Sequence, residues 1–146
     1  MANISRRLAI GVLIGMVLLL CGVCGMGAWL AFRNTRQALT ATQQTANQLL
    51  QALQQHQWQA AQQYFTSQAR TRFTPRLLQQ RWQPLEAAIG SVRDWAMEDF
   101  RVHTGTSGQW VQLRYRLQGA QGVGTVRLQL RWVGKRWLVE EMEIGW

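Results

Sequence analysis

Residues 125–132 read TVRLQLRW, an unbroken alternation of apolar and polar side chains. Residues 110–117, WVQLRYRL, alternate in the same way shortly before. Side chains of a β-strand point alternately to its two faces, so this period predicts two strands with one apolar face each. The short, glycine-rich connection between them makes the two strands antiparallel neighbours. The side chains expected on the apolar face are Val111, Leu113, Tyr115, Leu117, Val126, Leu128, Leu130 and Trp132.

Two further segments extend this pattern into a sheet. Residues 92–103 predict a long but irregular strand, because the run MEDF inside it breaks the alternation. The tetrapeptide GTSG at 105–108 predicts the turn that follows. The pair Gly134–Lys135 predicts a tight turn before a last strand over 137–144. Since the apolar face must pack against helices, we expect an α+β domain with helices on a curved antiparallel sheet of about four strands.

The chain before the first strand has helical rather than strand periodicity. Residues 35–55 are rich in Gln, Ala and Thr and place leucines at helical spacing. After a short break, a second helix is expected over 58–65. Thr74 followed by Pro75 is typical of a helix start, with a capping hydroxyl and a proline in the first turn. We expect Pro84 to interrupt that helix or to open another short turn.

The helical part and the last hairpin together resemble a known superfamily. The segments LLQAL (49–53), WQAAQQYF (58–65) and GKRWLV (134–139) are similar to parts of the nuclear transport factor 2-like, or cystatin-like, superfamily, including bacterial members with an N-terminal membrane anchor. The resemblance covers about residues 49–146 and implies a sheet wrapped around a conical pocket. Because this superfamily holds isomerases, dehydratases and cyclases beside non-catalytic modules, the resemblance implies no single activity.

An uncharged segment, residues 8–32, precedes the whole domain. As a helix it is about 37 Å long, enough to cross a hydrocarbon core of roughly 30 Å. Two arginines flank it on each side, as expected at lipid headgroups. We therefore expect a single-pass protein of the cell membrane. Its expected parts are a tail (1–7), a transmembrane helix as anchor (8–32), a helical stalk (33–47) and the α+β domain (48–146).

Three interpretations of the apolar segment stay open from the sequence: an uncleaved signal anchor, a signal peptide cleaved after Gly25-Met26-Gly27, and a lipoprotein signal ending at Cys21. The apolar run continues past that cleavage site, and Leu20 is bulky for a lipoprotein signal, so we favour the anchor. The flanking arginines do not decide orientation. The absence of charged residues over 37–69 favours a domain outside the cytoplasm. Cys21 and Cys24 both lie in the apolar segment, which leaves the domain without a disulfide.

The polar side of the two alternating strands is rich in arginine. Such a face is either solvated and laced with salt bridges, for which Glu141 and Glu143 are suitable partners, or a docking surface. Tryptophan beside arginine is typical of interfaces. We therefore favour a non-catalytic binding or scaffold module that recognises a protein or anionic partner, or a second copy of itself. The net charge of +9 is also typical of nucleic-acid binding, but a membrane anchor makes this the weaker hypothesis. The expected contact residues are Arg114, Arg116, Arg127, Arg131 and Trp110.

The alternative hypothesis is a small-ligand-binding protein or enzyme with an aromatic-lined conical pocket. Its expected walls are Trp58, Tyr64, Trp82 and Trp95. Pocket catalysis needs a carboxylate or imidazole with a tuned pKa, and the candidates are few. His56 lies at a predicted helix break, and His103 lies at a strand end. Asp94 and Asp99 are suited to surface charge pairs, so we assign no catalytic residue. Two histidines without a cysteine in the domain argue against a transition-metal site, and we expect no metal or cofactor. The candidates are His56, Asp94, Asp99 and His103.

Overall fold

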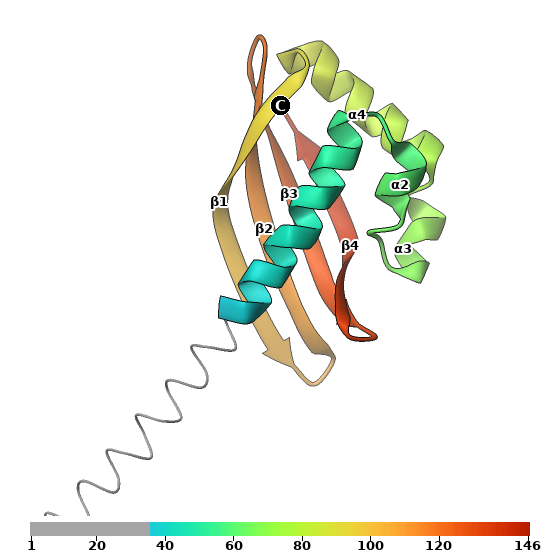
Figure 1. The fold of residues 1–146 in the computed structure, drawn as a ribbon, viewed down its shortest axis with the longest axis vertical. Coiled ribbons are helices and arrows are strands. Elements are labelled where there is room, and N and C mark those ends of the chain that lie inside the picture. The colour runs from blue at the N-terminus through green and yellow to red at the C-terminus, as the bar shows by residue number, and fades with distance from the viewer. Residues whose placement is uncertain (1–35) are drawn as a thin grey trace, which may run out of the picture. The chain divides into compact units, whose positions relative to one another are not determined.

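In the computed structural model, which describes residues 36–146, a four-stranded antiparallel sheet carries helices on one face (Figure 1). The strands lie side by side in chain order, β1-β2-β3-β4. The predicted α+β class with four antiparallel strands is confirmed. The strands are β1 (Val92–Gly105), β2 (Gly108–Gly119), β3 (Val123–Val133) and β4 (Arg136–Gly145).

The predicted membrane segment, residues 8–32, lies outside the described residues. Within residues 36–146, no helix combines the length and the apolar character that crossing a bilayer requires.

The alternation on β2 and β3 produces the buried face of the sheet, as predicted. Seven of the eight expected side chains are buried, and Trp132 is the exception with 48% of its surface exposed. Trp132 pairs with Trp137 next to the β3–β4 turn, and their rings are 5.4 Å apart. The indole of Trp132 therefore lies against another ring instead of inside the core.

The first helix of the described chain covers residues 36–54 and packs one side against the sheet. We predicted a stalk over 33–47, yet the compact unit begins at Leu39. The physical reason is burial, because Thr42 and Ala46 are already fully enclosed. The Thr42 hydroxyl donates to the Leu39 carbonyl at 2.8 Å, which satisfies its polar group inside the core.

The second helix is shorter than predicted. We expected a helix over 58–65, but α2 spans Trp58–Gln62. The chain then bridges to β4, where the Val139 N–H donates to the Tyr64 carbonyl at 2.8 Å and the Thr66 N–H donates to the Val139 carbonyl at 2.9 Å. These bonds use backbone groups that a longer helix would need, and they cover the outer edge of β4.

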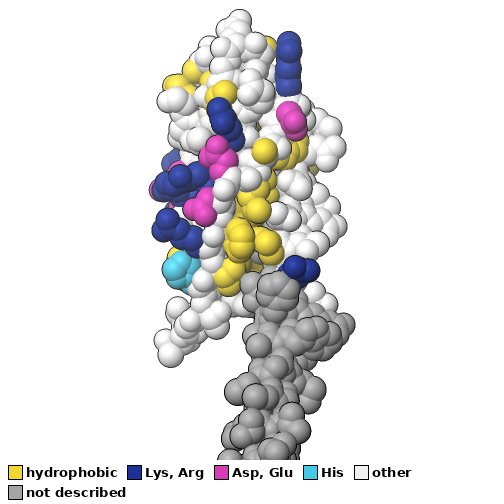
Figure 2. Space-filling model, turned by 90° about the vertical axis from the view of Figure 1, so that its left-hand side faces the viewer, with side chains coloured by type: hydrophobic (Ala, Val, Ile, Leu, Met, Phe, Trp, Pro, Cys, Tyr) yellow, Lys and Arg dark blue, Asp and Glu magenta, His cyan; other side chains and the backbone are white. Residues whose placement is uncertain are grey.

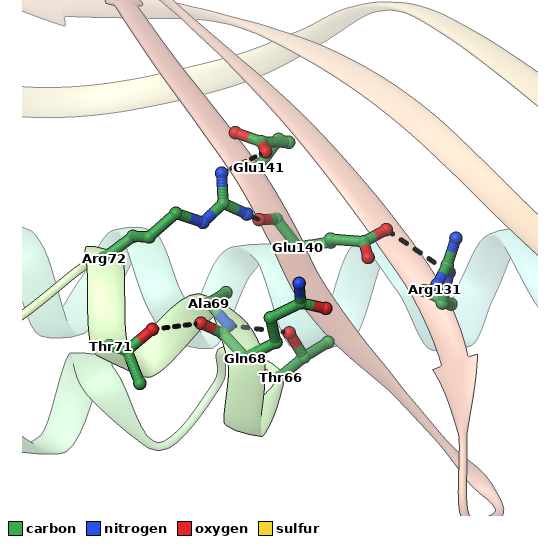
Figure 3. Close-up of polar contacts among 8 residues, drawn as sticks. All are labelled: Thr66, Gln68, Ala69, Thr71, Arg72, Arg131, Glu140 and Glu141. Atoms are coloured by element: carbon green, nitrogen blue, oxygen red, sulfur yellow. Dashed lines mark hydrogen bonds and ion pairs between the residues drawn. The ribbon is translucent and has the colours of Figure 1, made fainter.

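A helix that the sequence analysis did not predict follows directly. The helix α3 spans Ser67–Arg72, and the side chain of Thr66 caps it by accepting from the Ala69 N–H at 3.1 Å (Figure 3). Capping hydroxyls of this kind satisfy an N–H group that has no partner within the helix. The arginine at its last position, Arg72, then reaches the β4 backbone, donating to the Glu140 carbonyl at 3.1 Å.

The helix α4 runs uninterrupted over Pro75–Ile89, so the predicted break at Pro84 is wrong. The predicted start is confirmed, because the side chain of Thr74 accepts from the Leu77 N–H at 3.3 Å. Proline removes one backbone hydrogen bond and crowds the preceding turn. Burial of one side of the helix outweighs this cost, since apolar residues before and after Pro84 are enclosed. These residues are Leu78, Trp82, Leu85 and Ile89.

The end of α4 fits tightly against the β2–β3 connection. The Ile89 carbonyl accepts from the Gln121 N–H at 2.7 Å, and Gly90 turns the chain with a φ of 78°. A Cβ added at Gly119 would overlap the Ile89 carbonyl oxygen and lie 2.7 Å from its Cγ1. Glycine at this position therefore sets how closely α4 approaches the sheet.

We expect Gly119→Ala to lower the free energy of unfolding by about 1–3 kcal/mol, because the added methyl group forces α4 away from the sheet. Urea unfolding followed by tryptophan fluorescence measures this loss. Gly105→Ala is the matched control, since no atom lies within 4 Å of a Cβ added there. An equal effect of the two substitutions would contradict the packing argument.

Candidate functional site

The predicted arginines lie together on the outer face of the sheet, away from the helices. Arg114 on β2 is directly opposite Arg127 on β3, and Trp110 is directly opposite Arg131. Arg116 follows Arg114 on the same side of β2. The structure thus brings the whole predicted set onto one surface. We call the set Arg114, Arg116, Arg127, Arg131 and Trp110 the arginine face.

One of the two predicted acidic partners contacts this face. The Glu143 carboxylate lies 2.8 Å from Nη1 of Arg127, its direct cross-strand neighbour. Glu141 instead forms an ion pair with Arg72 of α3, as Figure 3 shows. The second glutamate therefore holds α3 against the sheet, and the proposed pairing with the arginine face applies to Glu143 only.

Two β-bulges each place a further glutamate beside the arginine face. In β1 the extra residue is Glu98, whose carboxylate is 4.0 Å from the guanidinium of Arg116. In β4 the extra residue is Glu140, 3.3 Å from Arg131 (Figure 3). A bulge leaves one residue outside the ladder and changes the direction of its side chain. Neither glutamate was predicted to contact this face, and only the broken alternation of MEDF indicates one of the two bulges.

Arg114 differs from the other arginines of this face. In the part of the chain that the structure describes, its guanidinium has no hydrogen bond and no ion pair, whereas the other three each face a glutamate. Its side chain is half-buried on the sheet. Its direct cross-strand neighbours are Asp99 on β1 and Arg127 on β3, so one carboxylate and one guanidinium flank it, and the pairing with Arg127 is unfavourable.

Two shallow hollows flank Arg114, and both are lined by Arg114 and Arg127. The larger, of about 380 Å³, also includes Glu98, Thr125 and Glu143. The smaller, of about 290 Å³, adds the side chains of Asp99, Arg101 and Gln112. Three guanidinium groups therefore surround the smaller hollow. On the side of the molecule shown in Figure 2, basic and acidic side chains gather together along its left border.

Trp110 and His103 form the end of this surface. Their rings are stacked, with centroids 3.8 Å apart and an interplanar angle of 10°. They are also direct cross-strand partners on β1 and β2. This stacking explains the position of His103 without a catalytic role, and it presents the half-buried Trp110 beside Arg131.

The four residues predicted to line a conical pocket do not meet. Trp82 is 1% exposed and belongs to the core of α4. Trp95 on β1 donates from its indole N–H to Oδ1 of Asn47 at 3.1 Å. Tyr64 lies in the bridge beside β4. None of these three lines a hollow described here, and Trp58 lines a separate one.

The hollow at Trp58 is wide and shallow, about 510 Å³, and it extends to Pro75 at the start of α4. His56 lines it as well, stacked on Trp58 with ring centroids 5.3 Å apart. Nε2 of His56 lies 2.9 Å from a carboxylate oxygen of Glu86. These contacts connect the segment before α2 to α4, and they give His56 a structural role in the helix break.

The remaining acidic candidates also have local partners. Asp94 accepts from the Trp95 backbone N–H at 2.8 Å, and Asp99 lies 3.7 Å from Nε of Arg101. Among residues 36–146, no group of three or more His, Cys, Asp and Glu side chains is arranged to hold a metal ion.

The fold has a distant structural relative. The 1.8 Å structure of Aln2 from a Streptomyces species matches with a TM-score of 0.51, over 75% of this chain and 90% of Aln2. The two sequences are 12% identical, so the match shows a shared fold and leaves the chemistry of each protein separate. No protein-family model and no curated protein sequence matches this chain.

The core holds two polar side-chain atoms without a hydrogen-bond partner among the described residues, Nε1 of Trp82 on α4 and the hydroxyl of Tyr115 on β2. Tyr115 is 2% exposed, and burial raises its pKa from 10.0 to about 12 because the phenolate loses its hydration. An unpaired buried hydroxyl costs stability at neutral pH, and a raised pKa makes stability fall at high pH.

We expect the free energy of unfolding to fall as the pH rises from 10 to 12, because the unfolded phenol ionises before the buried one. At about 1.4 kcal/mol per pH unit, the Tyr115 contribution reaches roughly 2–3 kcal/mol. Tyr115→Phe removes this contribution and leaves the protein as stable or more stable at pH 7. Urea unfolding at pH 10 and at pH 12 measures the loss in wild type and in the variant.

Tyr64→Phe is the matched control, since the chain has two tyrosines and this variant keeps Tyr115. The same alkaline loss in wild type and Tyr115→Phe would refute the assignment to Tyr115.

Proposed function

We propose that this chain is a non-catalytic binding or scaffold module of the cell envelope. In this proposal, residues 8–32 anchor it in the membrane as a single span, and the domain lies outside the cytoplasm. The domain is proposed to belong to the nuclear transport factor 2-like superfamily, which the α+β fold and the distant likeness to Aln2 support at the level of fold. Its arginine face docks an acidic segment of a partner protein.

The docking proposal rests on Arg114, whose guanidinium has no hydrogen bond and no ion pair within residues 36–146. It lies opposite Arg127 and lines both hollows of the arginine face. The smaller hollow is lined by three guanidinium groups and one carboxylate, Asp99, so a second carboxylate from a partner would offset the remaining positive charge and the repulsion between the two arginines. Arginine binds carboxylates through two parallel hydrogen bonds, and it is enriched at the centre of protein interfaces.

Two features favour binding over catalysis. Large apolar side chains, Trp82 among them, are buried between helices and sheet, where a conical pocket would need to open. The histidines and aspartates that catalysis would use have local partners and do not converge on one hollow. A catalytic site needs such groups around a common point.

Arg114→Glu tests the docking proposal, with an eight-residue oligoglutamate peptide as the probe. We expect the dissociation constant to rise at least tenfold, about 1.4 kcal/mol of binding free energy, because the central positive charge is reversed. Arg76→Glu is the matched control: it makes the same charge change at an exposed site on α4 and is expected to change binding less than twofold. If both variants weakened binding equally, net charge alone would explain the effect, and the docking proposal would be wrong.

The anchor is tested by fractionation of cells that express the full chain. We expect the protein to stay in the membrane pellet after washing at pH 11, and Leu18→Arg with Leu19→Arg to release it, since each arginine costs about 2.5–3.5 kcal/mol at the centre of a span. Gln48→Arg, at an exposed position of the first helix, is the control. Recovery of the wild-type chain in the soluble fraction would contradict the anchor.

A further inference from the structure

The strand β1 is a long edge strand with a free side. It spans 14 residues and pairs with β2 alone, whereas the outer edge of β4 forms a bridge between Val139 and Phe65. Near its start, the Val92 carbonyl accepts from the Gln54 side chain at 2.9 Å. Beyond that point, no strand of the described chain pairs with its outer edge. An edge of this length is a template for pairing with another strand.

The free edge also carries uncovered apolar surface. Phe100 is 42% exposed, although its cross-strand partner Leu113 on the inner face is fully buried. Trp95, Met97 and Val102 on the same strand are only half-buried. Figure 2, which views this side of the molecule, shows hydrophobic side chains in a continuous vertical strip. Apolar strips along a strand edge are typical of protein–protein contact sites.

The charged residues on either side of Phe100 can pair with the same residues of a second copy of the chain. The tripeptide Asp99-Phe100-Arg101 reads Arg-Phe-Asp in the opposite direction. In an antiparallel pair of two identical strands centred on Phe100, each Asp99 lies opposite Arg101 of the second copy. The two Phe100 side chains then lie next to each other on the inner face. Opposite charges in such pairs are favourable, and like charges are unfavourable.

The bulge at Glu98 continues this match along the strand. Glu98 is left outside the pairing of β1 with β2. When a second copy pairs with the outer edge in the same way, Val102, the next inner-face side chain after Phe100, comes opposite Met97 of that copy. Apolar side chains therefore face each other on both sides of the centre. Without the bulge, Val102 would instead face a glutamate.

We propose that two copies of this chain associate through their β1 edges, antiparallel and with a two-fold axis at Phe100, to form a continuous eight-stranded sheet. Asp99 and Arg101 also line the smaller hollow, so this interface borders the arginine face, but it does not depend on the proposed function. Edge pairing of this kind is isologous, since the same residues contribute from both copies. It satisfies the free backbone groups of β1 and covers Phe100 at once.

A charge-swap cycle tests the register in the full chain, solubilised in detergent and measured by sedimentation equilibrium. Asp99→Arg places two arginines opposite each other, and Arg101→Asp places two aspartates opposite each other. Each single variant is expected to weaken dimerisation at least tenfold. The double variant restores the opposite charges and is expected to return within about threefold of wild type. Arg76→Asp is the control, and it leaves the dimer unchanged.

A second measurement is disulfide formation in a variant with Cys21→Ala and Cys24→Ala. Cα atoms of directly opposite residues in antiparallel strands are about 4.5–5.5 Å apart, within the range of a disulfide. Phe100→Cys is therefore expected to crosslink two copies on mild oxidation, and Thr125→Cys on β3 is not. A monomeric wild-type chain, a dimer indifferent to the charge swaps, or equal crosslinking at both positions would overturn the proposal.

Discussion

Burial of the inner side of β2 and β3 determines how most other elements of this protein are arranged. Leu113, Leu117, Leu128 and Leu130 are all fully enclosed by the helices. Because side chains alternate along a strand, burying these leucines places the residues between them on the opposite face. The arginines therefore reach one outer surface as a consequence of core formation, without any direct attraction between them.

The same burial accounts for the helices. Burial of its inner side keeps α4 continuous through Pro84, and glycines of the β2–β3 connection let its end approach the sheet closely. The first helix enters the core at Thr42, well before the leucines that made its periodicity visible. Packing of apolar surface thus outweighs the local preference of Pro84 in α4, and it extends the compact unit toward the start of the first helix.

Electrostatics then shape the outer face. Two arginines opposite each other are unfavourable, and three glutamates lie close to the arginines around them. Two of these glutamates occupy bulges, so an irregularity of the ladder also supplies counter-charge. One arginine, Arg114, stays without such a partner in the described chain. Its nearest carboxylate along the ladder is that of Asp99, directly opposite it on β1.

Alternation and capping are local patterns, so the strands, their buried faces and the start of α4 could be predicted from the sequence. The same alternation predicts that the arginines share the outer face. The end of α2 at Gln62, the helix α3 and the glutamates in the two bulges depend instead on contacts between distant parts of the chain. The bridge between Tyr64 and Val139 joins backbone groups far apart in the chain. Every residue type offers the same carbonyl group, and all but proline the same N–H group, so such pairing leaves no pattern in the side chains.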